Sequence, residues 1–188
     1  GTIGKPVRAL ADGYISRIRV TNGSGYVLDV CYHNGYSTIN RHLSAFLSPI
    51  AERVKKLQYE NENWEVEIIP EPDEYPVKAG QRIALSGNTG YSFGPHLHLD
   101  VFETETGDYI DPMPFFKKNL KDTRAPKADG IMLFPQLGKG VVSGSQENKT
   151  ILPNSEHPVE AWGVIGTGIK AYDYMDGVNN HYGVYSVV

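Results

Sequence analysis

The sequence predicts a mostly β fold: an antiparallel sheet domain that carries an inserted helical arm, followed by part of a β-sandwich-like module. Short runs of β-branched and aromatic residues recur in the first part of the chain, and Asx-Gly pairs separate them. This pattern is typical of strands joined by tight turns. With 188 residues, 40% of them hydrophobic, the chain is long enough for one good core or two small ones.

The first strands follow one another closely along the chain. They are expected at Val7–Leu10, Tyr14–Val20, Tyr26–Tyr32 and Tyr36–Asn40. The Asx-Gly pairs between them, which are strong hairpin signals, are Asp12-Gly13, Asn22-Gly23 and Asn34-Gly35. We therefore expect these strands to form an antiparallel sheet.

A different kind of segment begins at Ser48-Pro49. Serine suits a helix N-cap, and proline suits the first helical position. Three apolar residues follow at helical spacing: Ile50, Val54 and Leu57. Trp64–Ile69 then alternates like a strand. We interpret residues 45–76 as an inserted arm, which either walls a cleft or is a surface elaboration without function.

The sheet is expected to resume at residues 77–87, and residues 122–126 resemble a linker. We therefore expect a first domain at 1–121 and a second module at 122–188. The apolar runs of the second module are Gly130–Phe134, Gly140–Val142, Val159–Trp162 and Tyr182–Val188. An isolated sandwich of the immunoglobulin type needs about 100 residues, and about 65 remain. We therefore expect this module to be incomplete at its C-terminal end.

Composition excludes several functional classes. The net charge is −4, and both signs are mixed along the chain, so no basic surface predicts a nucleic-acid partner. No run of 18 apolar residues predicts a transmembrane helix. The single cysteine, Cys31, excludes an internal disulfide, and its strand-like surroundings favour a buried thiol over a reactive one.

The most informative stretch is residues 86–101, SGNTGYSFGPHLHLDV. His96 and His98 alternate with leucines after a turn rich in glycine, proline and serine. A period of two places both imidazoles on one face of an expected strand, His96–Glu103. Such a pair either shares a metal ion or divides metal binding and proton transfer between its members. A pair of ordinary histidines is the alternative.

Three blocks of this sequence, Gly4–Gly13, Gly35–Ser44 and Gly87–His98, together resemble the LytM/lysostaphin-type zinc endopeptidases, which cut peptide cross-links in bacterial peptidoglycan. Gly87–His98 is similar to the closing pattern G-x-T-G-x-S-x-G-x-H-L-H of that family. Gly35–Ser44 is similar to its block G-Y-x-T-x-Y-x-H-L-S, and Gly4–Gly13 to its block G-x-P-V-x-A-x-x-D-G. The blocks occur in the family's order, and the resemblance covers about residues 1–115.

The resemblance implies a Zn²⁺ site with three protein ligands and an open position for water. It makes His98 one ligand, and it places the other two, a histidine and an aspartate spaced H-x3-D, upstream of the first block. Because the chain begins at Gly1, we expect an incomplete ligand set and weak or absent zinc binding. His96 and Asp100 also form an H-x3-D string, but along a strand they are about 13 Å apart, too far to share a zinc ion.

The resemblance gives His42 and His96 acid–base roles. One would help to deprotonate the zinc-bound water, and the other would stabilise the oxyanion or protonate the leaving amine. For His42 alone, a packing histidine is the alternative. Asn40 occupies a position where the family commonly has tyrosine, and we assign Asn40 and Asp100 to substrate binding or to support of the site.

These observations predict a zinc-dependent endopeptidase that hydrolyses peptide bonds in cell-wall peptidoglycan. Its partner would be a peptidoglycan peptide, and its location the bacterial cell envelope, as a periplasmic, secreted or surface-associated protein. The alternative is a degenerate, non-catalytic domain that binds peptidoglycan or regulates another wall hydrolase. A plain carbohydrate- or protein-binding module is less favoured, because His42, His96 and His98 all occupy positions that the resemblance makes functional.

Overall fold

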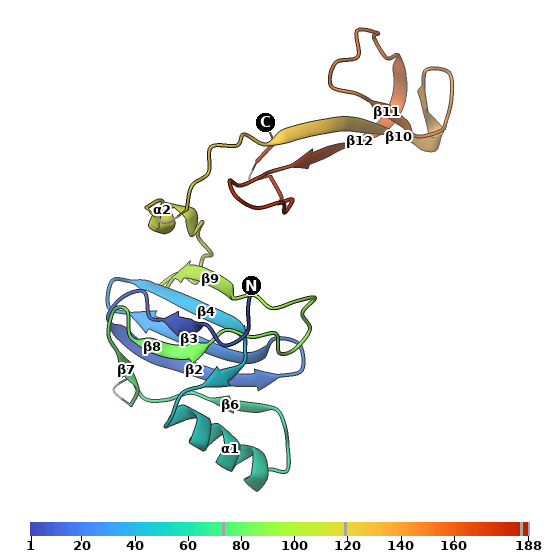
Figure 1. The fold of residues 1–188 in the computed structure, drawn as a ribbon. Coiled ribbons are helices and arrows are strands. Elements are labelled where there is room, and N and C mark those ends of the chain that lie inside the picture. The colour runs from blue at the N-terminus through green and yellow to red at the C-terminus, as the bar shows by residue number, and fades with distance from the viewer. Residues whose placement is uncertain (73, 119, 185, 188) are drawn as a thin grey trace. The chain divides into compact units, whose positions relative to one another are not determined.

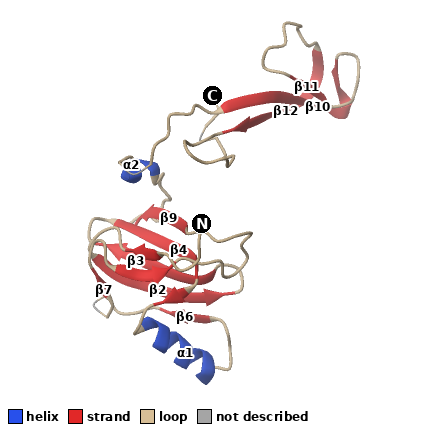
Figure 2. Ribbon diagram, in the orientation of Figure 1, coloured by secondary structure: helices blue, strands red, loops and turns tan. Residues whose placement is uncertain are grey.

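The computed structural model describes residues 1–188 apart from positions 73, 119, 185 and 188. It divides into two compact units, Gly1–Pro114 and Phe115–Val188. Strands dominate both units (Figures 1 and 2), so the predicted mostly β, antiparallel fold class is confirmed. The division lies at Pro114, a few residues before the expected domain end at residue 121.

The first unit contains two antiparallel sheets. The larger sheet has the order β6-β2-β3-β4-β9, with β7 also paired to β2, and the smaller has the order β1-β8-β5. The strands are β1 (Pro6–Arg8), β2 (Gly13–Thr21), β3 (Gly25–Tyr32), β4 (Tyr36–Leu43), β5 (Ala45–Phe46), β6 (Val66–Ile68), β7 (Pro76–Val77), β8 (Arg82–Leu85) and β9 (His98–Glu103). Both sheets contribute to one core, which includes Val7 and Ala84 from the smaller sheet and Ile18, Leu28 and Val30 from the larger.

Two of the three predicted hairpins are present. β2, β3 and β4 pair in sequence order, and the connections contain Asn22-Gly23 and Asn34-Gly35. The prediction of a hairpin at Asp12-Gly13 was wrong, because β1 pairs with β8 instead of β2. The Asp12 carboxylate accepts hydrogen bonds from the Ala79 amide at 2.8 Å and from Lys78 Nζ at 3.0 Å. This turn therefore fastens the chain to the 78–79 segment as it passes from one sheet to the other.

The arm contains the helix α1 (Ile50–Glu60), which buries Ile50 and Val54 against the core. The expected serine cap is absent: Pro49 is the N-cap residue, and the Ser48 hydroxyl donates to Glu52 Oε1. The strand expected at Trp64–Ile69 is shorter, and as β6 it pairs with β2 and forms one edge of the larger sheet. Among the residues that the structure describes, no helix has the length and hydropathy to cross a bilayer.

The second unit contains one three-stranded antiparallel sheet of order β11-β10-β12, formed by β10 (Lys127–Val142), β11 (Lys149–Ile151) and β12 (Ala161–Tyr172). The short helix α2 (Met113–Phe116) spans the division between the units. Two expected strands merge into β10, with a register shift between Pro135 and Gly140. Tyr182 forms only an isolated bridge with Asp173, and part of the expected Tyr182–Val188 strand lies outside the described residues. A second sandwich layer stays a prediction.

Candidate active site

The site lies on one face of the antiparallel strand pair β4 and β9. Arg41 lies opposite His98, and Ile39 lies opposite Asp100. Residues directly opposite each other in a ladder share a face of the sheet, so Arg41, His98 and Asp100 lie on one face. Thr38 and Asn40 alternate to the other face and are buried.

His42 departs from this alternation. A regular β4 would place its side chain on the buried face with Thr38 and Asn40. His42 instead has φ of 58°, in the left-handed region that non-glycine residues seldom adopt. Its imidazole lies with its ring centroid 5.8 Å from that of His98. Backbone strain of this kind is concentrated at functional sites, and here it brings a histidine to the face that carries His98.

A loop fixes the orientation of the His42 ring. His42 Nδ1–H donates to the Thr89 carbonyl oxygen at 2.9 Å, so Nε2 keeps its lone pair. Thr89 is itself held, because its hydroxyl donates to the Leu43 carbonyl at 2.6 Å and accepts from the Tyr26 amide at 3.0 Å. His42 is only 7% exposed, so its ring is held in one orientation.

Glycines allow that loop to lie directly on the strand ends. A Cβ at Gly87 would come within 2.4 Å of the Ser44 amide nitrogen, and a Cβ at Gly90 would come within 2.3 Å of the Gly25 nitrogen. Both distances are far below a van der Waals contact. The loop that carries Thr89 therefore touches the backbone of β3 and of the segment after β4 without side chains in between.

His96 lies before β9 and not within it, which corrects the prediction that one strand carries both histidines. Pro95 lacks the N–H that ladder pairing requires, and His96 makes only an isolated bridge with Gly87. His96 Nδ1–H donates to the Gly94 carbonyl at 2.8 Å, which leaves Nε2 with its lone pair. The turn, and not strand alternation, delivers this imidazole to the site.

His98 begins β9 and contacts a carboxylate. Its Nε2–H donates to Asp100 Oδ1 at 3.1 Å, so Nδ1 is the nitrogen with a lone pair. Asp100 Oδ2 accepts from Arg41 Nε and from a second guanidinium nitrogen, both at 2.9 Å. Arg41 also donates to the Ser24 hydroxyl at 3.3 Å. Asp100 is therefore held by Arg41 and in turn fixes the ring of His98.

The three predicted histidines converge. The ring centroids are 4.9 Å apart for His42 and His96, 5.8 Å for His42 and His98, and 6.3 Å for His96 and His98. One nitrogen from each ring lies within 4.8 Å of the others. Zinc–nitrogen bonds of 2.0–2.1 Å in a tetrahedral site would place two ligand nitrogens about 3.4 Å apart. The nitrogens are therefore close enough for one of them to contribute a ligand to a metal site while the others lie beside it, although they are wider apart than a complete ligand set would be.

The structure places the remaining predicted residue, Asn40, away from the histidines. It is 2% exposed, and its amide donates to the Leu28 carbonyl at 3.2 Å and to the Thr38 hydroxyl at 3.3 Å. This position is compatible with support of β4 and offers no open surface to a substrate. Sequence reasoning did not single out Arg41 or Thr89, although each lies within a recognised block.

The first residue of the chain lies at the edge of the cluster. A Cβ at Gly1 would lie 2.8 Å from the Pro95 carbonyl oxygen and 3.5 Å from His96 Cα. In Figure 1 the N label correspondingly lies next to the start of β9.

A charged row extends the site face across the sheet. Arg19 donates to both carboxylate oxygens of Asp29, at 2.7 and 2.8 Å. Burial raises the pKa of Asp29 above its ordinary value, and the positive charges of Arg19, Arg17 and Arg41 oppose that rise. Arg41 therefore acts on Asp29 through its field as well as on Asp100 through direct hydrogen bonds.

Comparison with known proteins defines the class to which this fold and site belong. The chain is 35% identical over 121 residues to the glycyl-glycine endopeptidase ALE-1 of Staphylococcus capitis, which covers 61% of this chain and 26% of that protein. It is 30% identical over 125 residues to the DD-carboxypeptidase/endopeptidase Mpg of Neisseria meningitidis, which covers 66% of this chain and 23% of that protein. The chain thus spans about a quarter of the length of these curated relatives, and no family model matches it.

Among solved structures, the catalytic domain of lysostaphin from Staphylococcus simulans is 30% identical, with a TM-score of 0.45. The match covers 62% of this chain and 74% of that domain. ALE-1 is an endopeptidase by name, and a further relative, from Haemophilus influenzae, is named an uncharacterized metalloprotease and is 35% identical over 98 residues, 52% of this chain and 16% of that protein. The chain belongs to the LytM/lysostaphin family of metallopeptidases, as its three blocks predicted.

Proposed function

We propose that this chain is the peptidase part of a zinc-dependent endopeptidase that hydrolyses peptide bonds in bacterial cell-wall peptidoglycan, in the cell envelope. The convergence of His42, His96 and His98, each with one lone pair left free by a fixed hydrogen bond, carries the proposal. The names of the relatives support it: ALE-1 is a glycyl-glycine endopeptidase and Mpg is a DD-carboxypeptidase/endopeptidase.

His98 is the residue of this cluster that fits a metal ligand. A ligating histidine commonly donates its other N–H to a carboxylate, which fixes the tautomer and raises the basicity of the ligating nitrogen. His98 has this arrangement, with Asp100 on Nε2 and the lone pair on Nδ1. When bound, zinc supplies a water of lowered pKa and polarises the scissile carbonyl.

His42 and His96 fit proton transfer. Each imidazole is anchored through Nδ1 on a backbone carbonyl, so each keeps Nε2 available as a base when neutral and as a donor when protonated. His42 is buried and rigid, whereas His96 lies on the exposed turn. We assign His42 and His96 the acceptance of the attacking water's proton and its return to the leaving amine.

The family resemblance calls for a further histidine and aspartate as ligands. We propose that they precede Gly1 in the parent protein. The position of Gly1 against Pro95 and His96 supports this proposal, because residues ahead of it begin their path at the cluster.

The test uses the intact parent protein and purified peptidoglycan. We expect soluble muropeptides with zinc present, and roughly 10²–10⁴-fold slower release for His42→Ala and His96→Ala, the usual scale for an acid–base group. His157→Ala, a histidine of the second unit, is the matched control and should retain full activity. If the intact protein binds peptidoglycan but releases no muropeptides, it is a non-catalytic adaptor and the proposed activity is wrong.

A further inference from the structure

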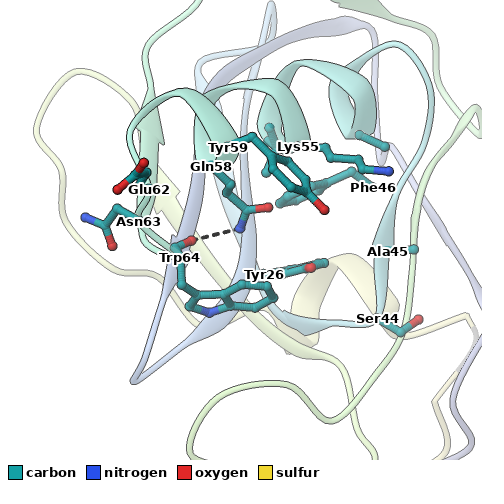
Figure 3. Close-up of a pocket in the computed structure, with 12 residues that line it drawn as sticks. Tyr26, Ser44, Ala45, Phe46, Lys55, Gln58, Tyr59, Glu62, Asn63 and Trp64 are labelled. Carbon is teal, nitrogen blue, oxygen red and sulfur yellow. Dashed lines mark hydrogen bonds between the residues drawn. The ribbon is translucent and has the colours of Figure 1, made fainter.

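A cavity outside the histidine cluster is not used by the proposed chemistry. It lies between α1 and the strands β3 and β5, and its volume is about 640 Å³ (Figure 3). Small-ligand sites commonly have volumes of about 300–1,000 Å³ and combine apolar walls with a few polar groups. The arm at residues 45–76 supplies most of the lining, so the arm forms a concave surface.

Aromatic rings form the walls of this cavity. Tyr26 stacks on Phe46 with centroids 5.1 Å apart, and the Trp64 ring is 5.7 Å from Tyr26. Tyr59 lines the opposite side in Figure 3. Even so, Trp64 is 54% exposed and Tyr59 is 75% exposed. Large aromatic faces left open on two sides of one cavity are typical of a ligand-binding surface.

The exposed Trp64 is held in place by its backbone. Gln58 Nε2 donates to the Trp64 carbonyl at 2.8 Å, a bond drawn in Figure 3, and the Asn63 amide donates to the Gln58 carbonyl at 3.1 Å. Glu62 lies in the left-handed region, with φ of 48°. A strained, hydrogen-bonded turn thus presents the indole before any ligand arrives, which lowers the entropic cost of binding.

The rim of the cavity is polar and carries both signs of charge. Lys55 and Glu62 supply one charge each, and Gln58 and Asn63 supply amides. The Lys55 ammonium lies 5.9 Å from the centroid of the Tyr59 ring. Balanced charges favour a neutral ligand, and open ring faces beside hydrogen-bonding groups favour one with an apolar face and a polar edge. A pyranose ring has this form, with C–H groups on its faces and hydroxyl or acetamido groups at its edge.

We infer that this cavity binds a neutral, N-acetylated sugar ring of a glycan strand. The inference rests on the proposed function, because peptidoglycan carries such sugars beside its peptides. The cavity is also tied to the site: the Tyr26 amide donates to the Thr89 hydroxyl, and the Thr89 carbonyl accepts from His42. A glycan held by the arm would anchor the substrate whose peptide is cut at the histidines.

The experiment titrates the full chain with a β-1,4-linked tetramer of N-acetylglucosamine, which contains no peptide. Trp162→Phe serves as the background, because it leaves Trp64 as the only tryptophan and a direct fluorescence reporter. We expect saturable binding and about tenfold weaker affinity for Trp64→Ala and for Tyr59→Ala, the scale of one lost aromatic contact. For the Trp64 substitutions, where the reporter is lost, calorimetry replaces fluorescence. Trp64→Phe keeps an aromatic face and should stay within about threefold of the parent.

Three outcomes would overturn the inference: no saturable binding of the tetramer, unchanged affinity in both alanine variants, or binding of a sugar-free stem peptide in this cavity in place of the tetramer. Tyr59 is largely exposed, so Tyr59→Ala remains informative even if Trp64→Ala unfolds the arm. The assay involves no hydrolysis and is independent of the activity test. Cleavage without sugar binding removes this inference alone, and sugar binding without cleavage removes the proposed activity alone.

Discussion

Arg41 lies directly opposite His98 across the β4–β9 ladder, and the carboxylate of Asp100 joins the two side chains. The guanidinium holds Oδ2 while Oδ1 accepts from His98 Nε2–H. A rigid strand pair therefore sets the tautomer and the direction of the proposed metal ligand. Arg41 reaches the reacting centre only through Asp100, so it is a positioning residue.

Replacing Asp100 with asparagine should weaken zinc binding by the intact protein. An amide lacks the negative charge and has one acceptor oxygen in place of two, so it cannot hold Arg41 and His98 on separate oxygens as the carboxylate does. Loss of such supporting contacts commonly costs 10–100-fold in metal affinity. Competition with a chromogenic chelator measures the change. Asp108→Asn, an exposed aspartate after β9, should leave the affinity unchanged. Equal zinc affinity in Asp100→Asn and the parent would show that the triad does not position the ligand.

Metal content should separate the three histidines. In the intact protein, His98→Ala should lose both zinc and activity, whereas His42→Ala and His96→Ala should lose activity with zinc retained. The reason is that His98 alone pairs its second nitrogen with a carboxylate. Elemental analysis after dialysis provides the readout. Loss of zinc in all three variants would assign the whole cluster to metal binding.

Residues 1–188 alone should bind zinc weakly. His98 is the one proposed ligand in this chain, and one nitrogen from each of the three imidazoles lies within 4.8 Å of the others, against about 3.4 Å between ligands in a tetrahedral zinc site. To act as substitute ligands, the rings would have to move closer against the hydrogen bonds that hold them. Dialysis of this chain followed by metal analysis should give well under one equivalent. A full equivalent retained after dialysis would show that the three imidazoles form a sufficient ligand set.

The His42→Gly variant should have a free energy of unfolding roughly 1 kcal/mol higher than the His42→Ala variant, the reverse of the usual order of glycine and alanine within strands. The left-handed φ of 58° penalises a Cβ but not glycine. Urea unfolding of His42→Gly and His42→Ala gives the difference directly, because both variants lack the imidazole. Alanine equal to or above glycine would mean that the backbone relaxes once the ring is gone.

Asp12→Asn should lower the melting temperature at neutral pH, with the loss disappearing in acid. The Ala79 amide and Lys78 hold the pKa of Asp12 below its ordinary value of 3.8. A depressed folded-state pKa contributes stability that is fully present above the unfolded value and is lost as pH falls through the folded one. Thermal scans of both proteins from pH 7 to pH 2 should therefore converge below about pH 3.8. A difference in melting temperature that stays constant from pH 7 to pH 2 would show that the ionisation of Asp12 does not cause the loss of stability.

The adjacency of β2, β3 and β4 was predictable because local signals and pairing agree: Asn22-Gly23 and Asn34-Gly35 connect strands that are neighbours in space. Asp12-Gly13 has the same local signal, but its strand pairs with distant β8, and no local pattern reveals such a partner. The predicted start of β9 is two residues too early, because the alternation of His96 with Leu97 extends the strand pattern back to the bend at Pro95.

Within the site, the sequence motifs identified the three histidines, whereas the backbone conformation that brings them together could be seen only in the structure. Strict alternation along β4 would have put His42 on the buried face, and only its left-handed conformation corrects this. Arg41 gives no signal in the sequence, because an arginine on a strand is usually solvated and its role depends on a register that places it opposite His98. The cavity beside Trp64 was equally unpredictable, since Tyr26 and Trp64 are 38 residues apart in sequence.

The close approach of Gly87 and Gly90 to the strand ends fixes the distance between the loop that carries Thr89 and the sheet. Where two backbones are in direct contact, no side chain lies between them whose size a substitution could change. The position of the loop that holds His42 therefore cannot be altered in small steps by substitutions at Gly87 or Gly90. Gly94, by contrast, has open space within 4 Å of the point where a Cβ would lie, and it belongs to the exposed turn before His96. Substitutions that change the distance between His42 and His96, whether by selection or by design, are therefore expected in the turn at Gly94 and not where Gly87 and Gly90 contact the strand ends.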